Sequence, residues 1–439
     1  MEEPVIVPRA DHSISRRDID PDALKVLYRL KEHNYAAYLV GGSVRDLLLA
    51  RRPKDFDIGT DAHPYQIKKL FRNCWIIGRR FRLAHVKFGQ KTIEVATFRK
   101  NVPVSPDEPP EAEAKPAEGA GQKPGRPGAA ALQRDNTFGT PEEDAFRRDF
   151  TVNGLFYNIA DHSVIDYVGG LGDLERRVLR SIGDPRVRFV EDPVRMLRAA
   201  VLGARLGFDL DELVVEAVAE HRQLIATASS ARLMEEYCKI LRSGYAEASV
   251  RALNRLRLLE LITPELASPP DAVWDSLARL DAYRLRFQSA PPELNNAILI
   301  GALLEPLGAL ARGPRDDAGR PDAGRISLGM LPVARRDLER LRHVAQMLPR
   351  LLDPDLPPRV ARSLPNRPAF DDALVWLEVF GDAPDALDRW TSARAQKAAA
   401  PDGRQGESGR RPRRRRRRRR RRPAGAGTPE SGGGRSGQS

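Results

Sequence analysis

Two aspartates in the segment PKDFDIGT have the type and spacing for metal-assisted chemistry. Asp55 and Asp57 are two positions apart, and residues at that spacing in a β-strand project from the same face. Two adjacent carboxylates repel each other unless a cation lies between them, and Mg²⁺ favours one or two carboxylates together with substrate phosphates. The spacing therefore predicts a metal-binding pair, with a solvated strand face as the alternative.

A glycine pair lies shortly before these aspartates, in LVGGSVRDLLL. Gly41 and Gly42 follow an apolar run and precede a helix, so the backbone there can approach a phosphate closely, and the free N–H groups of the helix start favour an anion. Arg45 adds a guanidinium in the first turn, and Asp46 is placed to order it. A phosphate-binding turn beside a carboxylate pair predicts a catalytic nucleotide site, whereas the turn alone would fit any tight strand-to-helix connection.

A third acidic residue would complete a two-metal centre, and the sequence offers two. Glu94 lies in TIEVATFR and faces away from the core-directed Ile93 and Val95. Asp149 follows Arg148 in RRDFTVN and is also suited to cap a short helix. The sequence leaves Glu94 and Asp149 as equal candidates.

The elements that must position these residues change character once along the chain. Apolar and alternating runs predict strands in the first part, with helices between them. The expected strands are 35–40, 56–58, 86–88, 92–98, 156–160 and 164–168, and the expected helices are 44–50 and 64–71. Later segments have helical period: 194–206, 213–225, 232–241, 246–253, 295–310, 338–348 and 373–380. The pattern predicts an α+β protein in which a small mixed sheet with helices precedes an all-helical neck, body and tail.

Length and charge distribution indicate several domains and segments of unusual composition. The chain has 439 residues, more than one ordinary domain. Its net charge is +13, of which residues 396–439 carry +12. That tail contains ten consecutive arginines, so we expect it to be disordered and to capture RNA phosphates, with an acidic protein partner or compositional drift as alternatives. A Pro/Gly/Ala-rich insertion at 102–133 is also expected to be disordered, and 311–325 to be a long loop.

Nothing in the sequence predicts export or a membrane span. The amino terminus is acidic and interrupted by prolines, unlike a signal peptide, and no apolar run approaches the ~18–20 residues that a membrane helix needs. Cys74 and Cys238 are too few for a disulfide framework or a four-thiolate zinc site. We therefore expect a soluble, cytoplasmic protein.

The motifs GGSVRD, PKDFDIGT, EVATFR, RRDFTVNGL and EDPVRMLRA occur in this order between residues 35 and 241. The set resembles the nucleotidyltransferase family that contains bacterial poly(A) polymerases and tRNA CCA-adding enzymes. The resemblance implies template-independent transfer of nucleotides from ATP to RNA 3′ ends, with Mg²⁺, or alternatively Mn²⁺, in a two-metal site. It assigns the metal to Asp55 and Asp57 and places Arg148 and Asp149 near the ribose. It assigns the triphosphate to Gly41, Gly42, Ser43 and Arg45.

In this family the protein reads the incoming base, and EDPVR is the matching motif. Asp192 and Arg195 are three apart, hence neighbours on a helical face, and a carboxylate with a guanidinium can imitate a Watson–Crick edge. Asp192 before Pro193 is equally suited to begin a helix. Arg198 and Arg232 are further candidates for positioning this pair.

The segment IIGRRFRLAHVKFG resembles a signature of the poly(A) polymerases. Its Arg79, Arg80 and Arg82 form either a basic patch that tracks RNA or a solvated edge strand. We therefore expect a polynucleotide adenylyltransferase. A CCA-adding or partial CCA-adding tRNA nucleotidyltransferase is the alternative enzyme, and a non-catalytic RNA-binding protein is the alternative from another class. The expected units are a lead segment with a helix (1–34), a nucleotidyltransferase head (35–168), a helical neck (169–265), a helical body (266–395) and the basic tail (396–439).

Overall fold

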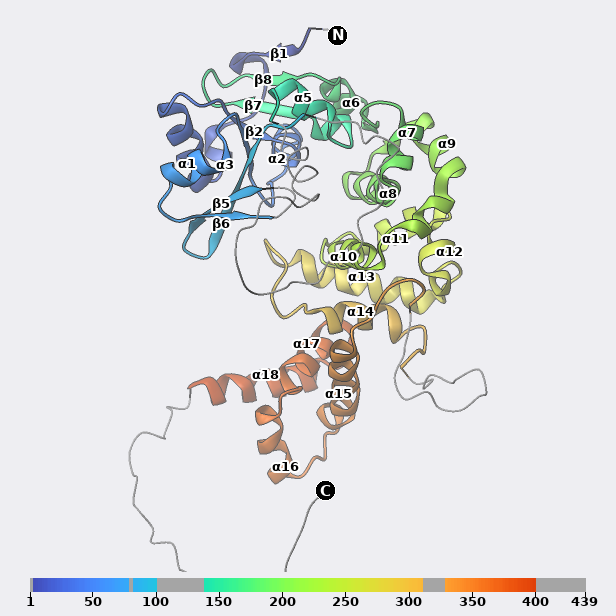
Figure 1. Cartoon of the computed structure of the whole chain (residues 1–439). Helices are drawn as coiled ribbons and strands as arrows, with labels where there is room; N and C mark the ends of the chain where they lie inside the picture. Colours follow the sequence, from blue (N-terminus) through green and yellow to red (C-terminus); the bar gives the residue numbers. More distant parts are fainter. Residues whose placement is uncertain (1–2, 79–81, 101–137, 311–327, 400–439) are drawn as a thin grey trace, which may run out of the picture.

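The computed structural model describes residues 3–78, 82–100, 138–310 and 328–399 (Figure 1). The expected insertion at 102–133 and the expected loop at 311–325 lie outside the described residues, as do Arg79, Arg80 and the tail from residue 400 onward. Residues 396–399, which we assigned to the tail, belong to the last helix, which runs from Pro384 to Ala399.

The first part of the chain is built around one mixed sheet of eight strands, in the order β1-β8-β7-β2-β3-β6-β5-β4. Strands β3 and β6 run parallel, and the other neighbouring pairs run antiparallel. The strands are β1 (Val5–Val7), β2 (Ala37–Val40), β3 (Asp57–Thr60), β4 (Cys74–Ile77), β5 (Leu83–Phe88), β6 (Lys91–Thr97), β7 (Leu155–Asn158) and β8 (Val164–Asp166).

The two faces of this sheet have different roles. Helices α1 (Pro21–Glu32) and α3 (Pro64–Leu70) pack on one face, where Leu39, Ile58 and Val95 are fully buried. The other face has a smaller apolar cluster that includes Val40 and Phe156 and is joined by Ala145 of α5 (Pro141–Phe146). Because side chains alternate between faces along a strand, the acidic residues Asp57 of β3 and Glu94 of β6 are directed to this second, less covered face.

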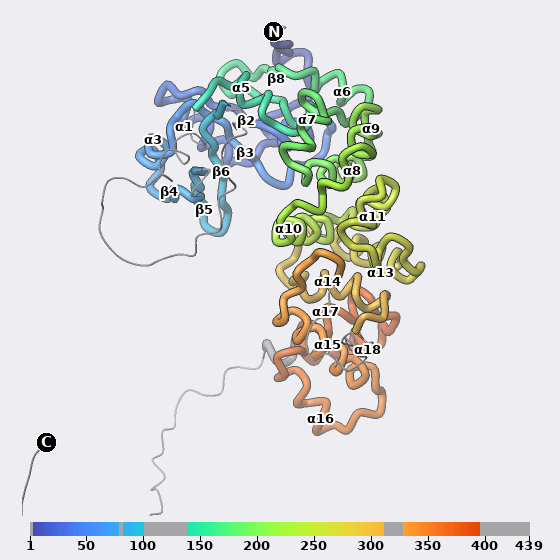
Figure 2. Tube along the Cα trace, turned by 45° about the vertical axis from the view of Figure 1, so that its right-hand side comes forward, coloured from blue at the N-terminus to red at the C-terminus, as the bar shows by residue number. Residues whose placement is uncertain are grey.

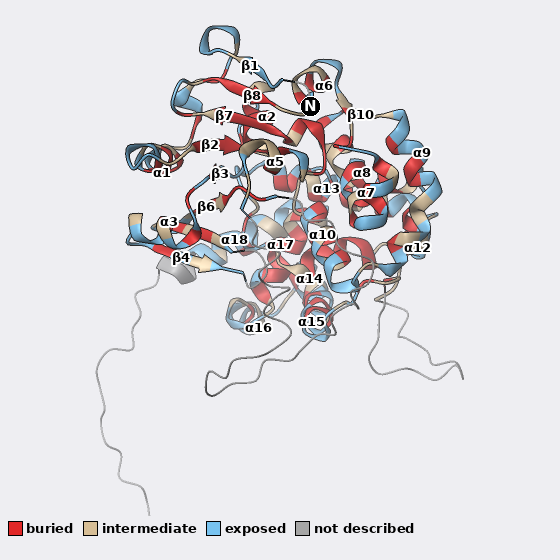
Figure 3. Cartoon of the chain, turned by 45° about the horizontal axis from the view of Figure 1, so that its top comes forward, coloured by how far each residue is buried: buried red, intermediate tan, exposed pale blue. Residues whose placement is uncertain are grey.

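Beyond residue 170 the chain is mostly helical and extends away from the sheet (Figures 1 and 2). The helices are α6 (Gly170–Arg176), α7 (Pro185–Glu191), α8 (Val194–Leu206), α9 (Glu212–His221), α10 (Ser230–Leu241), α11 (Ala246–Arg255), α12 (Leu259–Ile262), α13 (Asp271–Leu285), α14 (Asn296–Leu304), α15 (Arg335–Leu352), α16 (Pro358–Ser363), α17 (Phe370–Phe380) and α18 (Pro384–Ala399). Helix α2 (Gly42–Leu48) belongs to the first part and follows β2 directly. One hydrophobic cluster includes residues of both the sheet and the helical part, and buried residues, coloured red, occur in both parts in Figure 3.

The predicted α+β class is confirmed, with differences in detail. The region expected to be all-helical contains a short parallel pair, β9 (Val178–Leu179) with β10 (Asp209–Leu210). Helix α8 has the predicted bounds, whereas the long α13 and the edge strands β1 and β4 were not predicted. Edge strands are short and half exposed, so their sequences show little alternation. Among the described residues, no helix is long and apolar enough to cross a membrane.

Candidate active site

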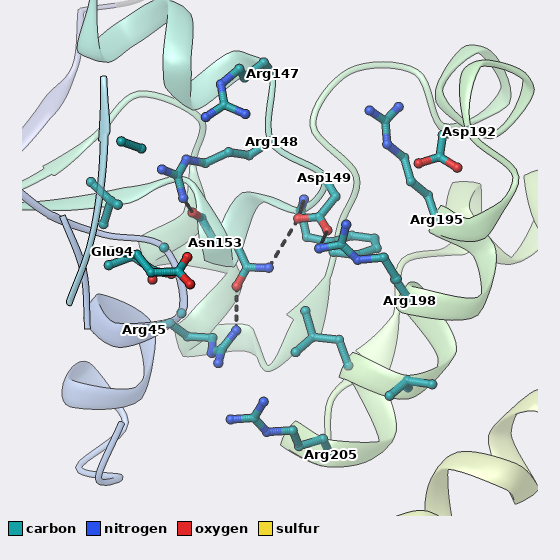
Figure 4. A pocket seen from close by; sticks show the side chains of 18 of the residues that line it. Arg45, Glu94, Arg147, Arg148, Asp149, Asn153, Asp192, Arg195, Arg198 and Arg205 are labelled. Carbon is teal, nitrogen blue, oxygen red and sulfur yellow. Dashed lines mark hydrogen bonds and ion pairs between the residues drawn. The ribbon is translucent and has the colours of Figure 1, made fainter. Parts of the chain in front are cut away.

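A pocket of about 630 Å³ lies between the polar face of the sheet and helix α8 (Figure 4). Its lining combines strand ends, the turn before α2, the segment after α5 and one side of α8. The predicted site residues in that lining are Gly41, Gly42, Arg45, Asp57, Glu94, Arg148, Asp149, Asp192, Arg195 and Arg198. Asp55, Ser43, Asp46 and Arg82 are not among the lining residues.

The register of the parallel pair β3–β6 brings two acidic residues together. Ile58 pairs with Val95, so the preceding residues, Asp57 and Glu94, are neighbours on the same face. Asp57 is open to the pocket but closely surrounded by protein. This desolvation raises the pKa of Asp57 to about 6, and the negative charges of Glu94 and Asp55 add to the effect. A carboxylate with an elevated pKa beside a second carboxylate is an environment that a divalent cation would stabilise.

Asp55 does not share a strand with Asp57, so that part of the prediction is wrong. Strand β3 begins at Asp57, which pairs with Val40, the last residue of β2. The chain then turns at Gly41, where φ is +71°, and no strand backbone remains opposite Asp55. Asp55 has a 74% exposed side chain and lies 3.7 Å from the ammonium of Lys54. Its charge nonetheless contributes to the raised pKa of Asp57.

The glycine pair lets two guanidinium groups approach the turn between β2 and α2. A Cβ at Gly41 would lie 2.7 Å from Nη1 of Arg148, and one at Gly42 would lie 3.2 Å from Nη2 of Arg45. Ser43 has a different orientation: it is buried, and its hydroxyl donates a hydrogen bond to the carbonyl of Val40 at 3.0 Å. The turn therefore presents backbone and arginines to the pocket, while the Ser43 side chain stabilises the turn.

A chain of polar contacts connects the two walls of the pocket (Figure 4). Arg45 donates to the side-chain oxygen of Asn153, and Asn153 donates to Oδ1 of Asp149 at 3.3 Å. Oδ2 of Asp149 lies 2.6 Å from Nη2 of Arg198 on α8. Asn153 was missed because an amide has no charge, and only its place in RRDFTVNGL could have drawn attention to it.

Asp46 holds Arg45 from the side away from the pocket. The Arg45 guanidinium is buried, which lowers its pKa, and the adjacent Asp46 opposes that shift. Nε of Arg45 donates to Asp46 at 2.8 Å, and the other carboxylate oxygen of Asp46 lies 3.3 Å from Arg205. Arg205 lines the pocket and was not predicted from the sequence. Asp46 thus orders two of the lining arginines; the sequence suggested its contact with Arg45 and not the one with Arg205.

Asp144 fixes the positions of the two arginines of the RRD segment. Arg147 and Arg148 both form ion pairs with this buried carboxylate, at 2.6 and 3.0 Å. The Arg148 guanidinium also lies 5.4 Å from the ring centroid of Phe156. Asp149 does not cap the following 3-10 helix, Thr151–Asn153, whose N-cap is Phe150; instead, Asp149 accepts the Phe150 N–H at 2.9 Å. The N-cap expectation was therefore wrong.

Asp192 is oriented by an arginine that is 40 residues later in the chain. Arg232 on α10 donates two hydrogen bonds to the Asp192 carboxylate, at 2.9 and 2.6 Å. Oδ1 of Asp192 also accepts the N–H of Val194 at 3.2 Å, so Asp192 stabilises the start of α8. Because α8 begins at Val194, Asp192 does not share a helical face with Arg195. Arg195 lines the same pocket and donates to Glu191 at 2.9 Å.

Arg82, the described member of the predicted basic patch, lies beside the pocket. It is exposed and precedes Leu83, a lining residue. Its guanidinium carbon lies 5.8 Å from the ring centroid of Tyr65, and it donates to the Tyr65 hydroxyl at 3.5 Å.

Comparisons with known proteins agree with this arrangement. Residues 37–180 match the family model described as poly A polymerase head domain, and residues 207–268 match the "Probable RNA and SrmB- binding site of polymerase A". These two segments of the chain are therefore similar to the head and RNA-binding regions of the poly(A) polymerase group of nucleotidyltransferases.

The individual relatives include both poly(A) polymerases and CCA-adding enzymes. Poly(A) polymerase I of Escherichia coli O157:H7 is 47% identical over 261 residues, which are 60% of this chain and 54% of that protein. The CCA-adding enzyme of Bacillus pumilus is 34% identical over 263 residues, 60% of this chain and 59% of that protein. The chain thus spans a little over half the length of these relatives. The structure of the Bacillus stearothermophilus CCA-adding enzyme in complex with CTP superimposes with a TM-score of 0.58 at 25% identity, covering 86% of this chain and 83% of that one.

Proposed function

We propose that this protein is a polynucleotide adenylyltransferase that adds AMP from ATP to RNA 3′ ends without a template. The observation that carries the proposal is the pocket itself, in which Asp57 and Glu94 face a set of arginines from two different walls. The two carboxylates would bind a metal ion beside the reacting hydroxyl, while the arginines would bind a triphosphate. The RNA 3′-oxygen attacks the α-phosphorus, and pyrophosphate leaves.

The donor set suits a divalent metal. Asp57 and Glu94 supply two adjacent carboxylates, the charge of Asp55 acts on Asp57, and substrate phosphates would supply the remaining oxygens that Mg²⁺ or Mn²⁺ requires. We favour Glu94 over Asp149 as the third acid because Asp149 already forms an ion pair with Arg198. The chemistry that bound metal supplies is a lower pKa of the hydroxyl and stabilisation of charge at phosphorus.

The protein's own groups have separate tasks in this proposal. Arg45 and Arg148, beside the glycine turn, would bind phosphates at the end of the central strand β2. Asn153 forms hydrogen bonds with both Arg45 and Asp149 and so fixes their relative positions. Asp149 would contact the ribose. Asp192 and Arg195 read the base edge, with Arg232 orienting Asp192 as the sequence suggested.

Relatives favour ATP polymerisation over CCA addition. The matched poly(A) polymerases I are 42–48% identical to this chain, whereas the matched CCA-adding enzymes are 34–35% identical over similar lengths. A solved relative binds CTP, and others were solved with ATP or tRNA, so a tRNA nucleotidyltransferase remains the second candidate.

We further propose that the expected units act in order along the chain. The head (35–168) would perform the transfer, the neck (169–265) would read the base, and the body (266–395) would hold RNA. The basic tail would add salt-sensitive RNA capture. Such an enzyme works in the cytoplasm, where both ATP and RNA are present.

The test supplies each nucleoside triphosphate separately, with an unstructured RNA and with a tRNA that lacks its 3′ end. Long A tracts on both RNAs are expected. Addition of two C and one A to the tRNA alone would instead establish the repair enzyme, and no incorporation with intact RNA binding would establish a non-catalytic protein. Asp55→Ala and Asp57→Ala should abolish incorporation while circular dichroism stays unchanged. Appreciable activity in either variant would refute the metal role.

A further inference from the structure

The sheet face that presents Asp57 and Glu94 continues outward over two more strands. The antiparallel registers place His85 of β5 opposite Glu94, and Trp75 of β4 opposite His85. Residues paired across strands project from the same face, so these four side chains form a row from the pocket to the edge of the sheet. At about 4.8 Å between neighbouring strands, Trp75 lies about 14 Å from Asp57.

The outer end of this row has an exposed aromatic ring next to a cation. Strand β4 is the last of the sheet, and Trp75 is 51% exposed there, while its neighbour Cys74 is buried on the helix-covered face. Nζ of Lys87, two residues after His85 on the same face, lies 5.4 Å from the Trp75 ring centroid. An exposed ring flanked by a positive charge offers stacking to a base and an ionic contact to its phosphate.

We propose that Trp75 and Lys87 bind the single-stranded 3′ segment of the RNA substrate, a few nucleotides before its reacting end. The inference rests on the function proposed above and adds a path for the RNA. Two observations select RNA as the occupant. The cation beside the ring complements a polyanion, and the row leads without a change of sheet face to the carboxylates where the 3′-hydroxyl would react.

Because Trp75 lies about 14 Å from Asp57, primers of two lengths can distinguish RNA binding by Trp75 from a merely structural role. A dinucleotide primer ends before it reaches Trp75, whereas a primer of about twelve nucleotides covers it. Trp75→Ala should raise the KM of the longer primer about five- to tenfold, the effect of losing one stacked base. It should leave the dinucleotide's KM and the KM of ATP unchanged, and Trp75→Phe should restore most of the loss.

Lys87 has a matched control in helix α1, which covers the opposite face of the same sheet. Nζ of Lys25 lies 5.6 Å from the ring of Phe88, the residue after Lys87, but on the helix-covered side. Lys87→Ala should weaken binding of the longer RNA and reduce the slope of log K against log salt by about one. Lys25→Ala removes the same charge from the same domain and should change neither quantity.

The outcomes separate this inference from the proposed function. If the wild type elongates RNA but Trp75→Ala binds both primers normally, the path is wrong and the adenylyltransferase proposal stands. If the wild type incorporates nothing, yet its RNA affinity falls in Trp75→Ala, the proposed function fails and the RNA surface remains. If Trp75→Ala instead alters self-association in sedimentation, with RNA affinity unchanged, β4 is a protein interface and the inference is overturned.

Discussion

Neutralising Asp57 should stabilise the metal-free protein while abolishing its proposed activity. The pKa of Asp57 is raised from 3.8 to about 6, first by desolvation and then by Glu94 and Asp55. A carboxyl whose pKa is higher in the folded state favours folding when protonated. That contribution is fully present below pH 3.8 and is lost as the pH rises through about 6. At pH 8 the folded protein therefore bears the whole cost of the charged Asp57.

The size of this cost follows from the shift. At 1.36 kcal/mol per pKa unit, the full shift corresponds to at most about 3 kcal/mol, and the openness of Asp57 to the pocket reduces this to about 1 kcal/mol through solvent screening. Asp57→Asn should then raise the melting temperature by about 1–2 °C at pH 8.

The assay is calorimetric melting in EDTA between pH 5 and pH 8. The gain of Asp57→Asn over wild type should grow with pH and level off above about pH 7. Asp55→Asn is the control, because its largely exposed side chain should give a smaller gain. Added Mg²⁺ should stabilise the wild type and not Asp57→Asn. A melting temperature that is unchanged or lower in Asp57→Asn at pH 8 would refute this account of the site's electrostatics.

Three other perturbations test separate parts of the structure. Arg232→Ala leaves Asp192 without its bidentate partner and should raise the KM of ATP about tenfold and weaken discrimination against CTP; equal ATP and CTP kinetics before and after the change would contradict the orienting role. Gly41→Ala forces a positive φ on a residue whose Cβ would lie 2.7 Å from Nη1 of Arg148, so incorporation should fall at least tenfold; a fully active variant would show that the turn is not constrained. Deleting residues 401–439, which carry a net charge of +11, should weaken RNA binding at low salt and flatten its salt dependence while single-turnover chemistry persists; RNA affinity unchanged at low salt would rule out capture by the tail.

The sequence alone was sufficient for features that depend on neighbours in the chain. The amphipathic period of residues 194–206 defined α8 to the residue, because helical side chains meet their partners three and four positions away. The same holds for the glycine pair, since the positive φ of Gly41 is a local requirement of the strand-to-helix turn. Motif order was equally informative, because it predicted, without any three-dimensional information, the similarity to poly(A) polymerases that residues 37–180 and 207–268 show.

Only the tertiary structure decided which distant side chains share the pocket. Glu94 lies beside Asp57 because β3 and β6 pair in parallel with one register, while Asp55 loses its place on the strand because β2 ends at Val40. Asp192 is likewise held by Arg232, from another helix. Strand register and helix docking are set by packing across the whole sheet and its covering helices, and a shift of one residue would turn every side chain to the other face. No local pattern in the chain records that choice, which is why the sequence left Glu94 and Asp149 as equal candidates and only the strand register places Glu94 beside Asp57.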